Sequence, residues 1–227
     1  MSESAPTKPA ATNPAVLKTL IFIMKTLKDQ NGRGNFNKTI QYLTKLLSIV
    51  LAEGNPKDPW AVSFAKASVF INNGRKLGFL GMFMDNFDAA AKTNWSNLRS
   101  ALTGASNLCN GVYYLFDNLI FLQKASLTEV MTANNQANYY AMLFFWFGQA
   151  FALAGDVMDM LQTTDAKKRQ DLYLNLVIRL GNLTYSSNGW NLSTNVLGSP
   201  FSEKTCAYAG LIAGAVALYK SAMSANK

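Results

Sequence analysis

The 227-residue sequence contains no histidine and only two cysteines, Cys109 and Cys206. Without histidine, the chain cannot build a Ser-His-Asp or Cys-His catalytic arrangement, or a metal site with imidazole ligands. The two cysteines lie far apart in apolar surroundings, so we expect buried, reduced thiols rather than zinc ligands. The Gly-x-x-x-x-Gly-Lys motif that cradles phosphates is also absent. We therefore expect a protein that is not an enzyme and that has no metal and no cofactor.

Clustered carboxylates are scarce as well. Two aspartate pairs, Asp85 with Asp88 and Asp156 with Asp159, have the i,i+3 spacing that places side chains together on a helix. Neither pair has a third carboxylate or a glycine-rich loop nearby, and a motif without its context is weak. We interpret both pairs as solvated helix surface or as caps that flank a membrane.

Charged residues make up only 15% of the chain, against about 25% in a typical soluble domain. Because 49% of the residues are hydrophobic, this shortfall favours membrane contact. The net charge of +8 indicates an anionic partner, either a nucleic acid or the acidic surface of a bilayer. We expect an anionic phospholipid membrane and no nucleic acid, because the positive charge is spread thinly among apolar faces without a recognition motif.

The N-terminal third predicts basic amphipathic helices. Residues 1–13 are small and polar and predict a flexible tail, and Asn13-Pro14 then marks a helix start. Apolar residues recur every three or four positions over 14–28 and 36–52, with a break predicted over 30–35. A third helix is predicted from Asp58-Pro59 to about residue 92. Such helices insert an apolar face into one leaflet, or else pack their apolar faces together as an ordinary bundle. The residues expected to bind the membrane are Lys18, Lys25, Lys28, Arg33, Lys38 and Lys45.

Three stretches without charge follow, over 100–116, 139–155 and 205–219. A spanning helix needs roughly 20 apolar residues, so each stretch is near the lower limit, and we predict about two and up to three spans. No alternation typical of strands is visible. The predicted fold class is therefore all-α, with basic amphipathic helices followed by an α-helical membrane bundle. The predicted regions are a tail over 1–13, an amphipathic region over 14–94, a membrane region over 95–223 and a short tail over 224–227.

Charge also predicts the topology. Residues 1–138 carry 14 basic and 8 acidic groups, residues 156–204 carry 5 of each, and residues 205–227 carry 2 basic groups. Since basic excess marks the cytosolic side, a multi-pass protein with both termini cytosolic is expected, with 139–155 and 205–219 as the pair of spans.

The run over 111–124 is apolar except for Asp117-Asn118 in its middle. An ionisable group in such a run is tolerated when it is paired or faces other protein, so we expect this helix to pack on its aspartate face. Whether 104–123 spans the bilayer or lies at its surface stays open. Gly210 and Gly214 form a Gly-xxx-Gly pair, which either joins two helices closely or simply fits a crowded bundle. The residues predicted for helix packing and self-association are Tyr113, Asp117, Asn118, Gly210 and Gly214.

Several of these segments resemble the peroxin-11 family of peroxisomal membrane proteins. Gly32-Arg33, the run 38–42 and the run 45–47 are similar to its N-terminal signature, and 73–78 is similar to its Arg-Lys helix. The most specific likeness is the central block over 113–122, which reads Tyr-Tyr-Leu-Phe-Asp-Asn-Leu-Ile-Phe-Leu. The resemblance covers about residues 16–220. The chain length and the Gly-Ala-rich last helix also resemble the glycosomal membrane members of kinetoplastid parasites.

The resemblance implies a peroxisomal or glycosomal membrane protein that elongates and divides the organelle. It would act through membrane-bending amphipathic helices, homo-oligomer formation and recruitment of the organelle fission machinery. Some members are linked to permeability for small metabolites, so a channel is the alternative function, with Asp117 and the Gly210/Gly214 face as candidate lining residues. The chain departs from the family at Gly34-Asn35, where an acidic and a basic residue are usual, and at 79–82, which lacks further basic residues. Both departures weaken electrostatic membrane bending and favour a structural or permeability role.

Overall fold

The computed structural model describes residues 14–124 and 134–225 of the chain. These residues form helices and no strand, which confirms the all-α fold class. The predicted tail over 1–13 lies outside the described residues, and the last helix continues through residues 224 and 225, where a tail was predicted. The elements are α1 (Pro14–Lys28), α2 (Gln30–Gly54), α3 (Pro59–Gly78), α4 (Met82–Ala91), α5 (Leu98–Lys124), α6 (Asn134–Gln162), α7 (Ala166–Ser187), η1 (Asn188–Trp190), α8 (Leu192–Leu197) and α9 (Glu203–Ala225).

The break predicted over 30–35 is wrong. Asp29 alone separates α1 from α2, and its carboxylate accepts a hydrogen bond from the backbone N–H of Gly32 (2.8 Å) as an N-cap. Gly32 and Gly34 are therefore helical, and both are needed for close approach. A Cβ at Gly34 would lie 2.6 Å from the ring of Phe79, and one at Gly32 would overlap the backbone of the preceding helix.

The helix predicted from residue 59 to about residue 92 is two helices. Its start is as expected, because Asp58 caps α3 by accepting hydrogen bonds from the backbone of Trp60 (2.7 Å) and Ala61 (3.1 Å). The chain turns after Gly78, and Gly81 has φ +84°, a left-handed conformation that glycine adopts without strain. α4 thus changes direction and packs on α5.

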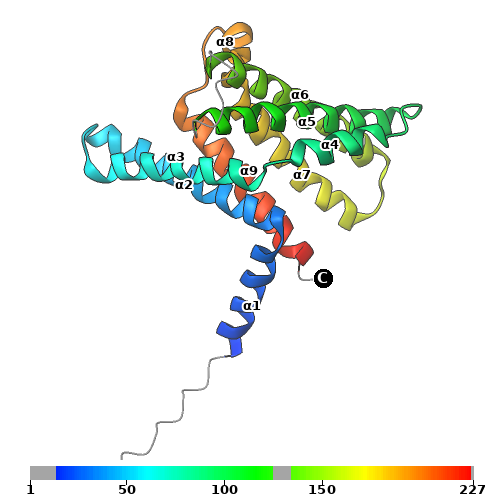
Figure 1. Cartoon of the computed structure of the whole chain (residues 1–227). Helices are drawn as coiled ribbons and strands as arrows, with labels where there is room; N and C mark the ends of the chain where they lie inside the picture. The colour runs from blue at the N-terminus through cyan, green and yellow to red at the C-terminus, as the bar shows by residue number, and fades with distance from the viewer. Residues whose placement is uncertain (1–13, 125–133, 226–227) are drawn as a thin grey trace, which may run out of the picture.

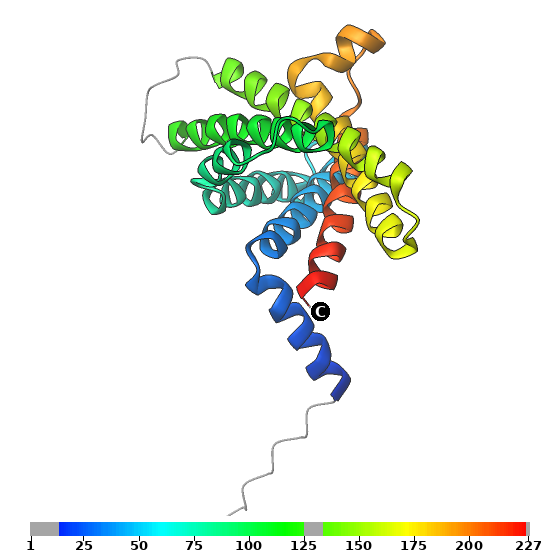
Figure 2. The ribbon, with the colours of Figure 1, turned by 90° about the vertical axis from the view of Figure 1, so that its right-hand side faces the viewer.

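The helices enclose a common interior (Figures 1 and 2). α5 packs along α6, α6 on α7, α7 on α9, α9 on α2, and α2 on α3, while α3 also reaches α5. α1 has few contacts, only with α2 and α9, and projects away from the other helices in both views. The helices therefore meet around one interior, from which α1 and the turn between α2 and α3 project.

Helix α7 is antiparallel to both α6 and α9. Along α6, Gln149 meets Asn182 whereas the later Asp156 meets Asn175. Along α9, the backbone near residue 209 meets Gly181, whereas the later Lys220 meets Asn175. α6 and α9 consequently both run opposite to α7.

Burial in the bundle differs from that of a typical water-soluble protein, in which exposed large apolar residues are scattered and buried charges are rare. Many large apolar side chains are exposed on every major helix, among them Met24, Phe36, Trp60, Phe70, Met84, Leu98, Leu161, Leu180 and Ile212. Several polar or charged side chains are buried: Lys38, Gln41, Lys76, Asp117, Asn118, Gln149, Asp156 and Asn182. Exposed apolar side chains, together with polar groups that face the interior, suit a helical bundle in lipid.

Two of the described helices are long and apolar enough to cross a bilayer, over residues 136–162 of α6 and 203–225 of α9. They contain the stretches 139–155 and 205–219, which confirms the expectation of about two spans. In each, only 33% of the most apolar window is buried inside the chain, whereas the core helix of a soluble protein would be mostly buried. The third stretch, 100–116, lies in α5 and does not meet the same criterion.

Candidate functional site

Four of the six basic residues predicted to bind the membrane lie on the exterior. Lys18, Lys25 and Lys28 of α1 and Arg33 of α2 are exposed. The apolar side chains over 21–24 of the same helix are also exposed, by 39–69%. Apolar side chains flanked by exposed cations are the composition of a helix that lies in the headgroup region of an anionic leaflet.

The other two lysines, Lys38 and Lys45, point toward the bundle, which corrects the prediction that all six face lipid. Lys38 is only 8% exposed and its Nζ donates a hydrogen bond to Oδ1 of Asn182 in α7 (2.6 Å). Lys45 is half-buried, with its Nζ 3.8 Å from a carboxylate oxygen of Glu203 in α9. The physical reason is that α7 and α9 cover the side of α2 from which these lysines project.

The central polar pair of α5 lies in the interior. Asp117 forms an ion pair with Lys76 of α3 (2.5 Å), and both side chains are almost completely buried. Asn118 is buried beside it, and its Oδ1 has no hydrogen-bond partner among the described residues. The ring of Tyr113 packs on Phe145 of α6, with ring centroids 4.7 Å apart. Asp117 thus joins α5 to α3, and the most specific segment of the sequence is a contact between helices.

Gly210 and Gly214 lie where α9 crosses α2. A Cβ at Gly210 would come within 2.5 Å of the ring of Tyr42, and one at Gly214 would lie 3.1 Å from Thr39. The two glycines let the helices of one chain approach closely. Because α2 occupies this face, a second copy of the chain cannot use it while α9 is in place.

A polar cavity of about 290 Å³ lies in the bundle interior. Side chains from α2, α3, α4, α5, α6, α7 and α9 line it, so the cavity is where these helices converge. Three cations face it, Lys38 from α2, Arg75 from α3 and Arg179 from α7, and no carboxylate belongs to its lining. Neutral polar groups complete the wall: Asn31, Asn35, Asn86, Asn110, Tyr113, Tyr114, Gln149, Asn182 and Tyr185.

Hydrogen bonds link several of these groups. The Oε1 of Gln149 accepts bonds from Arg179 Nη1 (3.0 Å) and Asn182 Nδ2 (3.0 Å), and Arg179 Nε lies 3.4 Å from Asp156. On the other side, Arg75 Nη1 donates to Gln41 Oε1 (2.5 Å). Sequence reasoning missed Gln149, Arg179 and Asn182. Gln149 offered a signal, since it is a polar residue in the middle of the span predicted over 139–155.

The interior changes the protonation of Lys38. Burial lowers the pKa of its ammonium group to about 7, and the positive charges of Arg75 and Arg179 act in the same direction. The ring of Tyr185 faces the Lys38 ammonium, with Nζ 5.7 Å from the ring centroid. Burial, with the nearby Asp117 charge, raises the pKa of Tyr113 well above its ordinary value, so this phenol stays a neutral donor.

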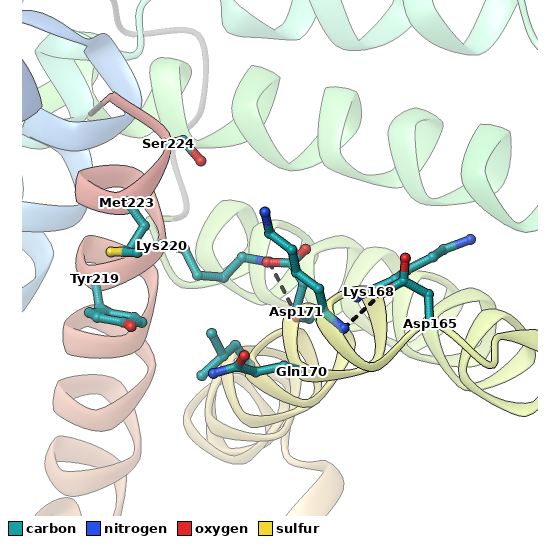
Figure 3. A pocket seen from close by; sticks show the side chains of 10 residues that line it. Asp165, Lys168, Gln170, Asp171, Tyr219, Lys220, Met223 and Ser224 are labelled. Carbon is teal, nitrogen blue, oxygen red and sulfur yellow. Dashed lines mark hydrogen bonds and ion pairs between the residues drawn. The ribbon is translucent and has the colours of Figure 1, made fainter. Parts of the chain in front are cut away.

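A second hollow lies between the start of α7 and the end of α9 (Figure 3). Its carboxylates are engaged locally. Lys220 reaches from α9 to Asp171 (3.0 Å), and Asp165 accepts hydrogen bonds from the backbone of Lys167 and Lys168 as the N-cap of α7. We assign this groove a structural role, because its carboxylates already have partners.

The two aspartate pairs predicted to be helix surface differ in their surroundings. Asp88 is exposed and pairs with Lys92, as expected for helix surface. Asp156 and Asp159 instead reach Arg179 and Arg99. No group of three or more metal-ligating side chains occurs within the described ranges, and both cysteines are free thiols.

A comparison with known protein families identifies the family of this chain. The model of the family "Peroxisomal biogenesis factor 11 (PEX11)" matches residues 22–173, which is well over half of the chain. The chain belongs to the PEX11 family. Searches of curated proteins and of solved structures found no significant match.

Membership in PEX11 makes the chain a peroxisomal membrane protein with a role in peroxisome biogenesis. The family consists of biogenesis factors and is not a family of enzymes. The matched region begins inside α1, contains all of α2, the Lys76–Asp117 pair and all of α6, and ends inside α7. The match does not separate a kinetoplastid glycosomal branch from the rest of the family, so that assignment stays a prediction.

Proposed function

We propose that this PEX11 protein shapes, elongates and helps divide peroxisomes by inserting α1 into the cytosolic leaflet, while α6 and α9 anchor the bundle in the bilayer. The observation that carries the proposal is the exposed apolar run 21–24 on a helix that stands outside the bundle and bears exposed lysines. Exposed apolar side chains flanked by exposed cations on one projecting helix fit a bilayer interface.

The mechanism follows from where the helix would lie. An amphipathic helix buried about 5–10 Å into one leaflet spreads that leaflet and favours positive curvature. Each exposed cation near an anionic surface adds on the order of 1 kcal/mol of attraction. Lys18, Lys25, Lys28 and Arg33 provide that attraction, whereas Lys38 and Lys45 do not, so the membrane-binding charge is smaller than the sequence suggested.

Self-association and recruitment of the fission machinery complete the proposal. The exposed apolar faces of α3 and of α9, which include Phe70 and Ile212, are available for contacts with further copies in the membrane. A homo-oligomer would concentrate the α1 wedges in one membrane patch and so increase the local curvature. Crosslinking of single cysteines placed at these two positions in native membranes would test this contact.

Two observations bear on the topology in opposite ways. The basic excess at both ends supports cytosolic termini. However, α6 and α9 run in the same direction along α7, so two crossings by these helices need a return through the bilayer by α7, which would place the C-terminus in the lumen. Protease protection of tags at each end of the chain in intact peroxisomes separates the two arrangements.

The shaping activity is tested with the full chain in giant vesicles that contain anionic lipid. A variant with Lys18, Lys25, Lys28 and Arg33 changed to glutamate should no longer form tubules, because its wedge is repelled from the surface. The matched control changes Lys66 and Lys92, which are exposed outside α1 and α2, to glutamate and should tubulate normally. Equal tubulation by all three proteins would refute the proposed mechanism.

A channel for small metabolites is the second candidate, favoured by the polar cavity at the centre of a bundle with an apolar exterior. The cavity, rather than Asp117 or the Gly210/Gly214 face, would provide the path, since those residues are occupied by contacts between helices. Solute flux through planar bilayers that contain the purified protein tests this function directly. No flux in the presence of correctly folded protein would exclude it.

A further inference from the structure

The cavity at the centre of the bundle has an unbalanced charge. Of its three cations, Arg179 is close to a carboxylate, since its Nε lies 3.4 Å from Asp156. Lys38 and Arg75 form no ion pair with any described residue. The carboxylate of Asp117 on α5 cannot balance them, because it is already paired with Lys76. Two basic side chains therefore line one polar cavity without a carboxylate to pair with.

Lys38 is withdrawn from solvent, and Arg75 is partly buried. Lys38 is more than nine-tenths buried, and the Nε of Arg75 is buried without a hydrogen-bond acceptor among the described residues. Burying charges without partners is unfavourable, because neither water nor a countercharge compensates the lost hydration. A fold that holds two such groups around a cavity is stabilised when an anion occupies that cavity.

The geometry points to a binding site in this cavity for a small dianion, the charge that a phosphate group carries. A phosphate monoester has a charge of about −1.5 to −2 at neutral pH, which would pair with the Arg75 guanidinium and favour the protonated form of Lys38. The guanidinium group of Arg75 offers a planar pair of N–H donors that suits phosphate oxygens, and Lys38 adds a point charge. Asn110 and Tyr114 present neutral polar groups that can complete the hydrogen bonding.

The size of the cavity limits the ligand. At about 290 Å³ it is at the lower end of the range for small-molecule sites, so it admits an inorganic anion or a compact phosphorylated molecule. The same chemistry is presented by a soluble phosphorylated metabolite and by the phosphate of a lipid headgroup. This inference goes beyond membrane shaping and does not depend on it, because the site involves the bundle interior and not α1.

The test is a titration of the full chain in nanodiscs of neutral phosphatidylcholine, read out as the thermal unfolding midpoint at constant ionic strength. The probes are sulfate, inorganic phosphate and glycerol 3-phosphate, with chloride as the monovalent control. Phosphatidic acid in the nanodisc forms the lipid arm. We expect saturable stabilisation by the dianions and none by chloride, because a ligand that binds only the folded state raises its stability. Response to phosphatidic acid alone would identify the lipid source, and response to glycerol 3-phosphate the soluble one.

Variants locate the site. Lys38→Met and Arg75→Gln should each weaken the apparent affinity about tenfold or more, because each removes a charged donor. Arg75→Lys keeps the charge and should retain part of the binding. Lys66→Gln, on the exposed side of α3, should bind as the unmodified chain does. Equal stabilisation of all these proteins, equal effects of chloride and sulfate, or no response of the unmodified chain to any dianion would overturn the inference. The comparison of chloride with sulfate and the response to dianions both use the unmodified chain. The test therefore remains decisive even if a variant fails to fold.

Discussion

Helix α1 and the interior face of α2 carry the same kind of residue in opposite surroundings. Lys25 and Lys28 of α1 are exposed beside exposed apolar side chains, whereas Lys38 of α2 is buried against Asn182 and Tyr185. The difference arises because α1 projects from the bundle, whereas α2 packs against α3 and α9 and its Lys38 reaches Asn182 of α7. Cations on α1 can meet lipid headgroups, while cations in the interior can meet only a ligand or another side chain.

The largest loss of stability is expected when a carboxylate is removed from the interior. Asp117→Leu leaves Lys76 buried without its partner, and breaking a buried pair on one side destabilises by about 3–5 kcal/mol. Chemical unfolding of the detergent-solubilised chain measures the loss. The double variant Asp117→Leu with Lys76→Met should recover most of the stability, since no unpaired charge remains. As a surface control, Asp88→Leu should change stability by less than about 1 kcal/mol.

The buried Lys38 should also make the stability of the folded chain depend on pH, whereas the exposed lysines of α1 should not. The pKa of Lys38 is about 7 in the folded chain and 10.5 as the ordinary value, so the unfolded chain binds more protons between these two values. Stability should accordingly rise with pH from about 7 to about 10.5, by at most about 1.4 kcal/mol per pH unit from this group.

The groups that face Lys38 are Arg75 on α3, Arg179 and Tyr185 on α7, and Tyr113 across the cavity on α5. Other residues titrate in the same range, so the measured quantity is the difference between the unmodified chain and Lys38→Met. An unchanged difference between pH 7 and pH 10 would show that Lys38 is not buried as described. The same substitution at exposed Lys25 should give no such difference.

A smaller effect is expected where α9 meets α2. Gly210→Ala places a methyl group about 2.5 Å from the Tyr42 ring, and such overpacking costs about 1–3 kcal/mol. Gly74→Ala in α3 has open space around the new methyl group and should be neutral or slightly stabilising. Thermal unfolding of both variants measures the contrast. If Gly210→Ala were as stable as Gly74→Ala, the contact between α2 and α9 would be looser than described.

The smallest effect is expected at the rim of the same contact. Lys45→Gln removes a half-exposed ion pair of 3.8 Å with Glu203, and pairs of this kind contribute less than about 1 kcal/mol. Unfolding at low and at high salt should give nearly the same difference between the variant and the unmodified chain. A loss as large as that of Asp117→Leu would mean that α2 depends on Lys45 in a way that burial does not indicate.

Patterns along the chain predicted helix starts and apolar stretches well, because these depend on neighbouring residues. Asp58-Pro59 marked the start of α3, and the stretches 139–155 and 205–219 lie within the two helices able to span a bilayer. The prediction was wrong over 30–35, where two glycines next to polar residues are usually a turn signal. There the glycines serve the close approach of Phe79 and of the end of α1, which are contacts that no window of sequence contains.

The site was harder to predict than the helices. Tyr113, Asp117 and Asn118 were recognised because they interrupt an apolar run, but their partner Lys76 comes from a different segment. Gln149, Arg179 and Asn182 belong to no motif and become a group only when α6 and α7 pack together. Lys38 was placed among the membrane-facing lysines, because helical periodicity says which residues share a face and not which neighbour covers that face.

The composition and periodicity of this chain determine that it is helical, poor in charge and suited to a membrane, since those properties depend on each residue and its near neighbours. The motifs over 32–122 were enough to indicate the PEX11 family. Tertiary structure alone decided which cations face lipid and which face the interior cavity. The physical reason is that burial and charge pairing depend on residues far apart in sequence, as in Lys38 with Asn182 and Lys76 with Asp117.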